Sequence, residues 1–213
     1  MVSKQLEYIC ARAKSWHIFE GNYEDLRASC HELANPEAEY RINEIRWIMD
    51  EDAHLKMLDI ERKFHNFLAS AKTLVDHTRV LMNNYSETET QFYEAFEARR
   101  KEIGNSSTVK LCHDLRNYFL HQRNPINLYC YHNTLYEDEN IMVQRGFVRI
   151  TKESLREYSK WSKESMREID LLEHPLDIKE LADRYFKKIS EFNSWVDYEL
   201  SSYLERSNNL RQP

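Results

Sequence analysis

The chain has 213 residues, which fits a single domain with a substantial hydrophobic core. It is rich in aromatic residues and holds only 3 Gly and 4 Pro, a composition typical of long helices rather than an all-β fold. The net charge of −6 argues against broad electrostatic coating of nucleic acid. Neither a membrane span nor an apolar signal core is visible, so we expect a cytoplasmic protein that does not contact membranes.

Helical patterns dominate the first part of the chain. Asn22–Ala34 is predicted to form a short helix that is capped by Asn22 and ends before Asn35-Pro36. Residues 36–83 contain neither Gly nor Pro, and apolar residues recur there at helical spacing. This stretch predicts either one very long helix or two helices joined by a kink. The polar run Asp50-Glu51-Asp52 is the expected bend.

Two further helices are predicted between residue 86 and about residue 122. Ser86 can cap the first of them, with Glu89 at the capping-box position, and Gly104 is a suitable residue to end it. The next helix begins within residues 105–108 and runs to about Gln122.

The sequence pattern changes after Pro125, which ends the preceding helix. Apolar and polar residues alternate over residues 126–131, and residues 141–150 are rich in β-forming residues. The polar run 137–140 connects the two segments. The pattern predicts a β-hairpin, with Gly146 as a candidate bulge.

Helical spacing returns after the hairpin. Thr151 is predicted to cap a helix that ends at His174-Pro175, and a last long helix follows from Ile178. The predicted fold is mainly α: an antiparallel bundle of five to six helices, with a β-hairpin inserted at about residues 126–150. We expect one domain that covers residues 1–213.

No residue pattern predicts a metal or cofactor. The four cysteines are scattered and form no C-x-x-C pair, so free thiols are expected. Glu51 and His54 form one Glu-x-x-His half-motif of a di-iron bundle, but the second pair that such a site needs is missing. The sequence also lacks a Gly-rich phosphate loop.

The helix before Pro125 carries an unusual polar stripe. On a helical wheel, one face is apolar and belongs to the core, with Leu111, Leu115, Tyr118 and Phe119. The opposite face holds groups that bind or protonate anions, namely His113, Asp114, Arg116, Asn117 and His121. Val109 and Leu120 also lie on that polar side, which favours a partner surface over open solvent.

These residues suit acid–base chemistry at a phosphate. His121 lies in the last turn, where the helix dipole favours a protonated imidazole that can act as a general acid. The planar guanidinium of Arg116 matches the geometry of a phosphate. Asn117 lies one turn before His121 and can orient its ring.

The run Arg116-Asn117-Tyr118-Phe119-Leu120-His121 resembles the R-x4-6-H motif of the HEPN superfamily, in which a polar residue often follows the Arg. Many members of that family are metal-independent endoribonucleases, and some act as toxins or in defence against phage. They dimerise so that two motifs face each other across a cleft. The resemblance covers the motif helix well and the rest of the chain only as an architecture.

The resemblance implies a homodimer that cleaves RNA without a metal or cofactor, with Arg116 and His121 as catalytic residues. His121 would take or give a proton at the 2′-hydroxyl or the leaving oxygen, and Arg116 would stabilise charge on the phosphate. Asn117 would contact the substrate or support the site, and His113 and Asp114 are further candidate supporting residues. The rival hypothesis is a non-catalytic dimerisation module or a scaffold that binds nucleotide or RNA.

Two departures from the family pattern bear on these expectations. Toxin members paired with a nucleotidyltransferase antitoxin often carry a Tyr two residues after the His, where this chain has Arg123. This difference weakens the toxin–antitoxin version of the hypothesis. The hairpin is not part of the minimal bundle: Tyr129 and Tyr131 could stack bases or cover the site, or they could be buried sheet aromatics.

Overall fold

The computed structural model describes residues 4–35, 40–41, 51–85, 90–136 and 141–209, and every structural statement below concerns these residues. They form seven helices: α1 Lys4–Ala34, α2 Glu51–Asn83, α3 Thr90–Gly104, α4 Ser107–His121, α5 Lys152–Arg156, α6 Lys163–Asp170 and α7 Ile178–Asn209. Four strands accompany them: β1 Tyr40–Arg41, β2 Leu128–Tyr136, β3 Ile141–Ile150 and β4 Leu176–Asp177. The predicted fold class, a helical bundle with an inserted hairpin, is confirmed.

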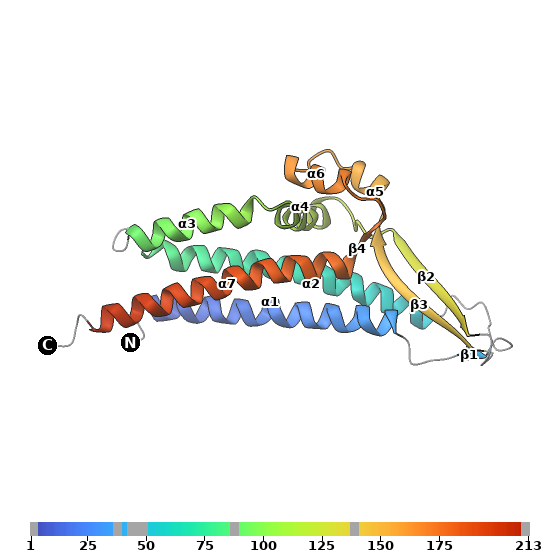
Figure 1. Ribbon diagram of the computed structural model, residues 1–213, viewed down its shortest axis with the longest axis horizontal. Coiled ribbons are helices and arrows are strands. Elements are labelled where there is room, and N and C mark those ends of the chain that lie inside the picture. Colours follow the sequence, from blue (N-terminus) through green and yellow to red (C-terminus); the bar gives the residue numbers. More distant parts are fainter. Residues whose placement is uncertain (1–3, 36–39, 42–50, 86–89, 137–140, 210–213) are drawn as a thin grey trace.

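The three long helices α1, α2 and α7 form the body of the molecule (Figure 1). Helix α3 lies along one side of this body, α4 crosses the same side and is seen end-on, and the short helices α5 and α6 cover α4. The hairpin slants across the end of the bundle where α1 finishes and α2 begins. Among the described helices, none combines the length and the apolar character that crossing a bilayer requires.

Helix α1 is much longer than predicted. The expected start at Asn22 is wrong, because Gly21 and Asn22 lie in the middle of the helix. A continuous stripe of buried residues crosses this point, formed by Phe19, Tyr23, Leu26, Cys30 and Leu33. A Gly inside a helix costs about 1 kcal/mol relative to Ala. Burying five side chains against α2 and α7 outweighs that cost.

The prediction for residues 36–83 is partly wrong. Tyr40 and Arg41 form strand β1, which pairs antiparallel with Met142 and Ile141 of β3, so these two residues are not helical. The expected bend at residues 50–52 coincides with the start of α2 at Glu51. The predicted cap at Ser86 with Glu89 lies outside the described residues. The predicted end of α3 at Gly104 is confirmed.

The sheet is built on β3. Strand β2 pairs along one edge of β3, while β1 and β4 pair with opposite ends of its other edge. The expected bulge at Gly146 is wrong, because Gly146 pairs one-to-one with Tyr131 in an unbroken register. The glycine serves a different purpose: a Cβ at this position would lie 2.7 Å from Cγ of Leu33. The close approach of β3 to α1 therefore requires a residue without a side chain.

The single helix predicted after Thr151 is two helices. The Thr151 side chain accepts a hydrogen bond from the Ser154 amide, which confirms the cap of α5. The chain then turns, and the indole of Trp161 donates a hydrogen bond of 2.6 Å to the carbonyl of Leu155. Ser162 caps α6 by accepting from the Ser165 amide. Burial of Trp161 and this second cap explain the break.

Candidate functional site

Helix α4 buries the face that the sequence assigns to the core. Leu111 and Leu115 are fully buried, and Tyr118 is nearly so. Phe119 is half-buried and meets Phe64 of α2 edge to face, at 5.8 Å between ring centroids. This packing against α2 fixes the rotation of α4 and so decides which of its residues face outward.

The outer side of α4 carries the candidate catalytic residues. His113 and His121 are exposed, as is Leu120 at 46%, while Arg116 and Asn117 are half-buried. They follow one another at intervals of three and four residues, so they form a single stripe along the helix. Leu120 is thus an exposed apolar residue within a row of His, Arg and Asn.

The guanidinium of Arg116 makes few hydrogen bonds within the described chain. Its Nη1 donates to Oδ1 of Asn117 at 3.3 Å. Its Nε is buried and has no hydrogen-bond partner among the described residues. No carboxylate in the described part of the chain pairs with this guanidinium, so its charge is available to an anion.

Arg116 and His121 lie on the two flanks of the stripe. Five residues at about 100° each place the two side chains about 140° apart around the helix axis. No hydrogen bond between them exists within the described chain. One copy therefore does not bring the two groups together on one phosphate by itself, and a site built from both needs a second surface to face this stripe.

Asp114 points away from that stripe and holds α6 against α4. Its Oδ2 accepts hydrogen bonds from the Ser162 amide at 2.9 Å and the Ser165 hydroxyl at 2.7 Å. Burial of the carboxyl opposes its ionisation, but the His113 ring 3.7 Å away and hydrogen bonds from Ser162 and Ser165 outweigh burial and keep the pKa of Asp114 well below its usual range. In the structure Asp114 is thus an ionised anchor between two helices.

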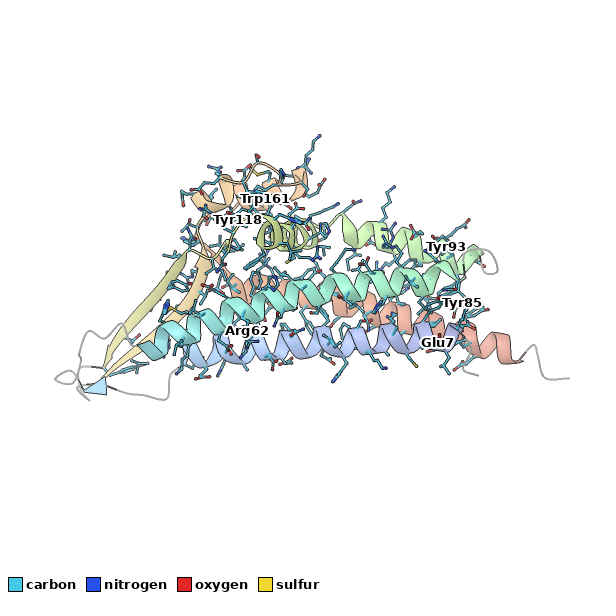
Figure 2. All side chains as sticks on the ribbon, turned by 180° about the vertical axis from the view of Figure 1, so that it is seen from behind. Glu7, Arg62, Tyr85, Tyr93, Tyr118 and Trp161 are labelled. Atoms are coloured by element: carbon cyan, nitrogen blue, oxygen red, sulfur yellow. The ribbon has the colours of Figure 1, made fainter. Side chains whose placement is uncertain are left out.

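Arg123 follows α4 and connects it to the turn after α5. Its Nε donates to the Tyr118 hydroxyl at 2.8 Å, and its Nη2 pairs with Glu157. Tyr118 also packs against Tyr158 and Trp161, with ring centroids 4.8 Å and 6.0 Å away; Figure 2 shows Tyr118 and Trp161 side by side. Sequence patterns did not indicate this network, because its two halves, Tyr118 with Arg123 and Glu157 with Tyr158 and Trp161, lie more than thirty positions apart.

The hairpin is tied to α2 by Glu61. This carboxylate accepts hydrogen bonds from the Tyr129 hydroxyl and the Asn124 side-chain amide. Burial raises the pKa of Glu61 above its usual value. Tyr129 is half-buried in this contact, so it does not offer a free ring to a base. The side chain of Tyr131 lies outside the described residues.

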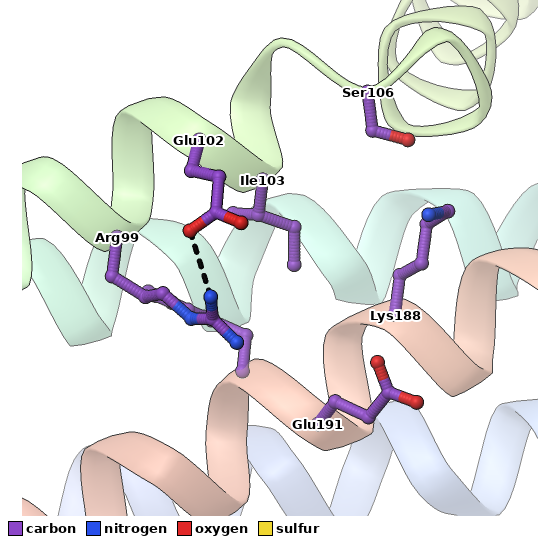
Figure 3. Close-up of a pocket in the computed structure, with 7 residues that line it drawn as sticks. Arg99, Glu102, Ile103, Ser106, Lys188 and Glu191 are labelled. Atoms are coloured by element: carbon purple, nitrogen blue, oxygen red, sulfur yellow. Dashed lines mark hydrogen bonds and ion pairs between the residues drawn. The ribbon is translucent and has the colours of Figure 1, made fainter.

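A cavity of about 140 Å³ lies between the end of α3 and α7 (Figure 3). Two basic and two acidic side chains line it: Arg99, Lys188, Glu102 and Glu191. Arg99 and Glu102 form an ion pair of 2.7 Å across its wall. The cavity contains neither Arg116 nor His121, and its balanced charge does not select one kind of ligand.

The described residues include no group of three or more His, Cys, Asp or Glu side chains that could hold a metal ion. All four cysteines are free, and burial raises the pKa of the Cys30 thiol to about 12. Comparison with protein-family models, curated proteins and solved structures finds no match to this chain.

Proposed function

We propose that the protein is a metal-independent endoribonuclease of HEPN type, which acts in the cytoplasm as a homodimer. The observation that carries the proposal is the outer stripe of α4. There the Arg116 guanidinium, which no carboxylate of the described chain pairs with, and the exposed His121 imidazole flank the exposed Leu120. Toxicity or defence against phage is the setting that the family resemblance suggests.

Two copies would meet through this stripe, with Leu120 of each copy near the centre of the contact. Arg116 of one copy and His121 of the other would then flank a common space. The neutral imidazole of His121 takes the proton of the ribose 2′-hydroxyl, and the 2′-oxygen attacks the adjacent phosphorus. The bond to the 5′-oxygen breaks, and this oxygen takes up the proton that the His121 imidazolium now carries. A 2′,3′-cyclic phosphate remains.

The other residues of the stripe take supporting parts. Arg116 donates hydrogen bonds to the non-bridging phosphate oxygens, on which negative charge grows in the transition state. Asn117 accepts from Arg116 and so sets the direction of the guanidinium. His113 adds a further donor on the same side of α4. Asp114 supports the site at a distance, because it fixes α6 against α4.

The proposal is tested by incubating the purified protein with transfer or messenger RNA in EDTA. We expect cleavage by the wild-type chain and a loss of at least about a hundredfold in His121→Ala and Arg116→Ala. His17→Ala is the matched control, because His17 is an exposed histidine on α1. Cleavage by His121→Ala at the wild-type rate, or no cleavage by the wild-type chain, overturns the proposal. In the latter case, RNA binding without cleavage would support the scaffold hypothesis.

A further inference from the structure

The two faces of the hairpin differ in their contacts. Residues that are paired across β2 and β3 share a face, and successive residues alternate between faces. The inner face meets the helices: Gly146 approaches Leu33, Val148 is buried, and Tyr129 bonds to Glu61. The outer face consists of the alternate residues, and within it His132 and Tyr136 are exposed.

Aromatic and basic side chains interleave on this outer face. Phe147 lies at its centre, with the His132 ring 5.0 Å from it and the Arg149 guanidinium 5.0 Å above its ring. Arg145 lies opposite His132 in the register, and its guanidinium donates to Thr134 at 3.2 Å. The four side chains form one surface of rings and cations, which we call the hairpin platform.

The charge of this surface has one sign. Neither β2 nor β3 contains an Asp or Glu, although the whole chain has a net charge of −6. Asp177 of β4 lies at the base of the hairpin, 3.5 Å from Nε of Arg149. Asp177 also accepts the amides of Lys179 and Glu180 at the start of α7, so its charge is shared. Arg145, further along the hairpin, has no such acidic partner among the described residues.

The hairpin that carries the platform follows α4 directly in the chain. Only residues 122–127 separate His121 from the first residue of β2. This connection is held in place, because Asn124 bonds to Glu61 and Asn127 exchanges hydrogen bonds with Thr151. A strand of RNA that lies along the outer face of the hairpin would therefore reach the base of β2, which six residues separate from the end of α4.

From this geometry we infer that the hairpin platform binds single-stranded RNA, with a base stacked on the exposed His132 ring, which the half-buried Phe147 supports, and phosphates held by Arg145. Unpaired bases stack on aromatic rings whatever their sequence, and cations beside the rings track the backbone. A duplex offers no free base faces, so it should bind less well. The choice of RNA rests on the proposed function.

The test measures binding rather than cleavage. Fluorescence anisotropy follows a labelled single-stranded RNA of about 12 nucleotides, in EDTA and in the His121→Ala background so that the RNA stays intact. We expect Phe147→Leu and Arg145→Gln each to weaken binding about tenfold. Affinity falls with salt concentration, and a plot of the two logarithms gives a slope. Arg145→Gln should reduce the magnitude of this slope by about one. A duplex of the same sequence should compete poorly.

Two controls match the variants in chemistry and lie on exposed surface outside the hairpin. Tyr198→Leu removes an exposed ring from α7, and Arg167→Gln removes an exposed guanidinium from α6. The inference is overturned if the RNA does not bind, if the platform variants bind as tightly as their controls, or if the duplex competes equally. Circular dichroism checks the fold, and if Phe147→Leu fails to fold, Arg145→Gln alone decides.

The outcomes for the two proposals are distinct. If the platform variants lose binding while the wild-type chain cleaves nothing, the hairpin binds RNA and the ribonuclease proposal fails. If the wild-type chain cleaves RNA but the platform variants bind normally, the ribonuclease proposal stands and this inference fails.

Discussion

Asp114 anchors the first turn of α6, where its carboxylate accepts from the Ser162 amide and the fully buried Ser165. We predict that Asp114→Ala lowers the free energy of unfolding by about 2 kcal/mol, because both donors lose their partner in a largely water-free place. Ser107→Ala, in the first turn of α4, removes a bond to a different carboxylate, Glu168, and serves as a comparison. Urea denaturation at neutral pH measures both variants.

The Asp114 carboxyl also makes the free energy of unfolding depend on pH. Burial opposes its ionisation, but the His113 ring 3.7 Å away and the hydrogen bonds from Ser162 and Ser165 outweigh burial, so its pKa in the folded protein lies below its ordinary value. The stability that it contributes is therefore complete above about pH 4 and is lost as pH falls further. The stability gap between the wild type and Asp114→Asn should be constant from about pH 5 to pH 8 and shrink in more acidic buffer. A gap that widens toward acid contradicts this assignment.

Gly146 is constrained by its neighbour rather than by its backbone conformation. Adding a Cβ would place it 2.7 Å from Cγ of the buried Leu33, so either the side chain or β3 must move. We predict that Gly146→Ala destabilises the protein by about 1–3 kcal/mol. The cost should be smaller in a Leu33→Ala background, which is a double-mutant cycle read by thermal unfolding. Additive effects of the two changes would show that the contact is not the cause.

At the scale of elements, Arg12 joins α1 to α7. The side chain is buried, pairs with Asp197, and donates to Oδ1 of Asn193 at 2.6 Å. Arg12→Ala should cost about 3 kcal/mol, since it leaves a cavity and an unpaired amide oxygen between the two helices. Arg62→Ala removes an exposed ion pair with Asp59 and should cost less than about 1 kcal/mol. Equal losses in urea denaturation would contradict the buried role of Arg12.

Local sequence patterns predicted the elements whose ends are marked by a capping residue, a glycine or a turn. The end of α3 at Gly104, the hairpin and the cap at Thr151 were all predictable, because each depends on residues close together in sequence. Local patterns did not predict strand β4 or the early start of α1. Two-residue β4 is defined by its partner β3, and α1 continues through Gly21 because of the helices that pack on it.

The candidate site was also predictable only where it depends on residues close together in sequence. Helical periodicity correctly separated the buried side of α4 from the side that carries Arg116 and His121. It could not show that Asp114 turns to α6, because the donors that hold it lie about fifty residues later in the chain. The alternation of Arg145, Phe147 and Arg149 in β3 was a signal for the hairpin platform, but strand periodicity alone does not tell which face is covered.

At the scale of the whole molecule, the bundle leaves the outer stripe of α4 uncovered while α5 and α6 cover the adjacent side. Arg116 and His121 diverge around the helix, so the proposed chemistry depends on a second copy. If two stripes face each other, Leu120 is buried in the contact. Replacing it by Glu would place two like charges and two desolvated carboxylates at the centre of the dimer.

We therefore predict that Leu120→Glu converts a dimer to a monomer in sedimentation velocity and removes RNA cleavage, without changing the thermal unfolding of the single chain. Leu171→Glu is the matched control, because Leu171 is 80% exposed at the end of α6, away from the stripe. Cleavage per molecule by the wild type should also rise with protein concentration around the dissociation constant of the dimer. A dimer that survives Leu120→Glu would locate the contact elsewhere. A fully active monomer would show that one copy of α4 suffices, against the 140° separation of its two reactive side chains.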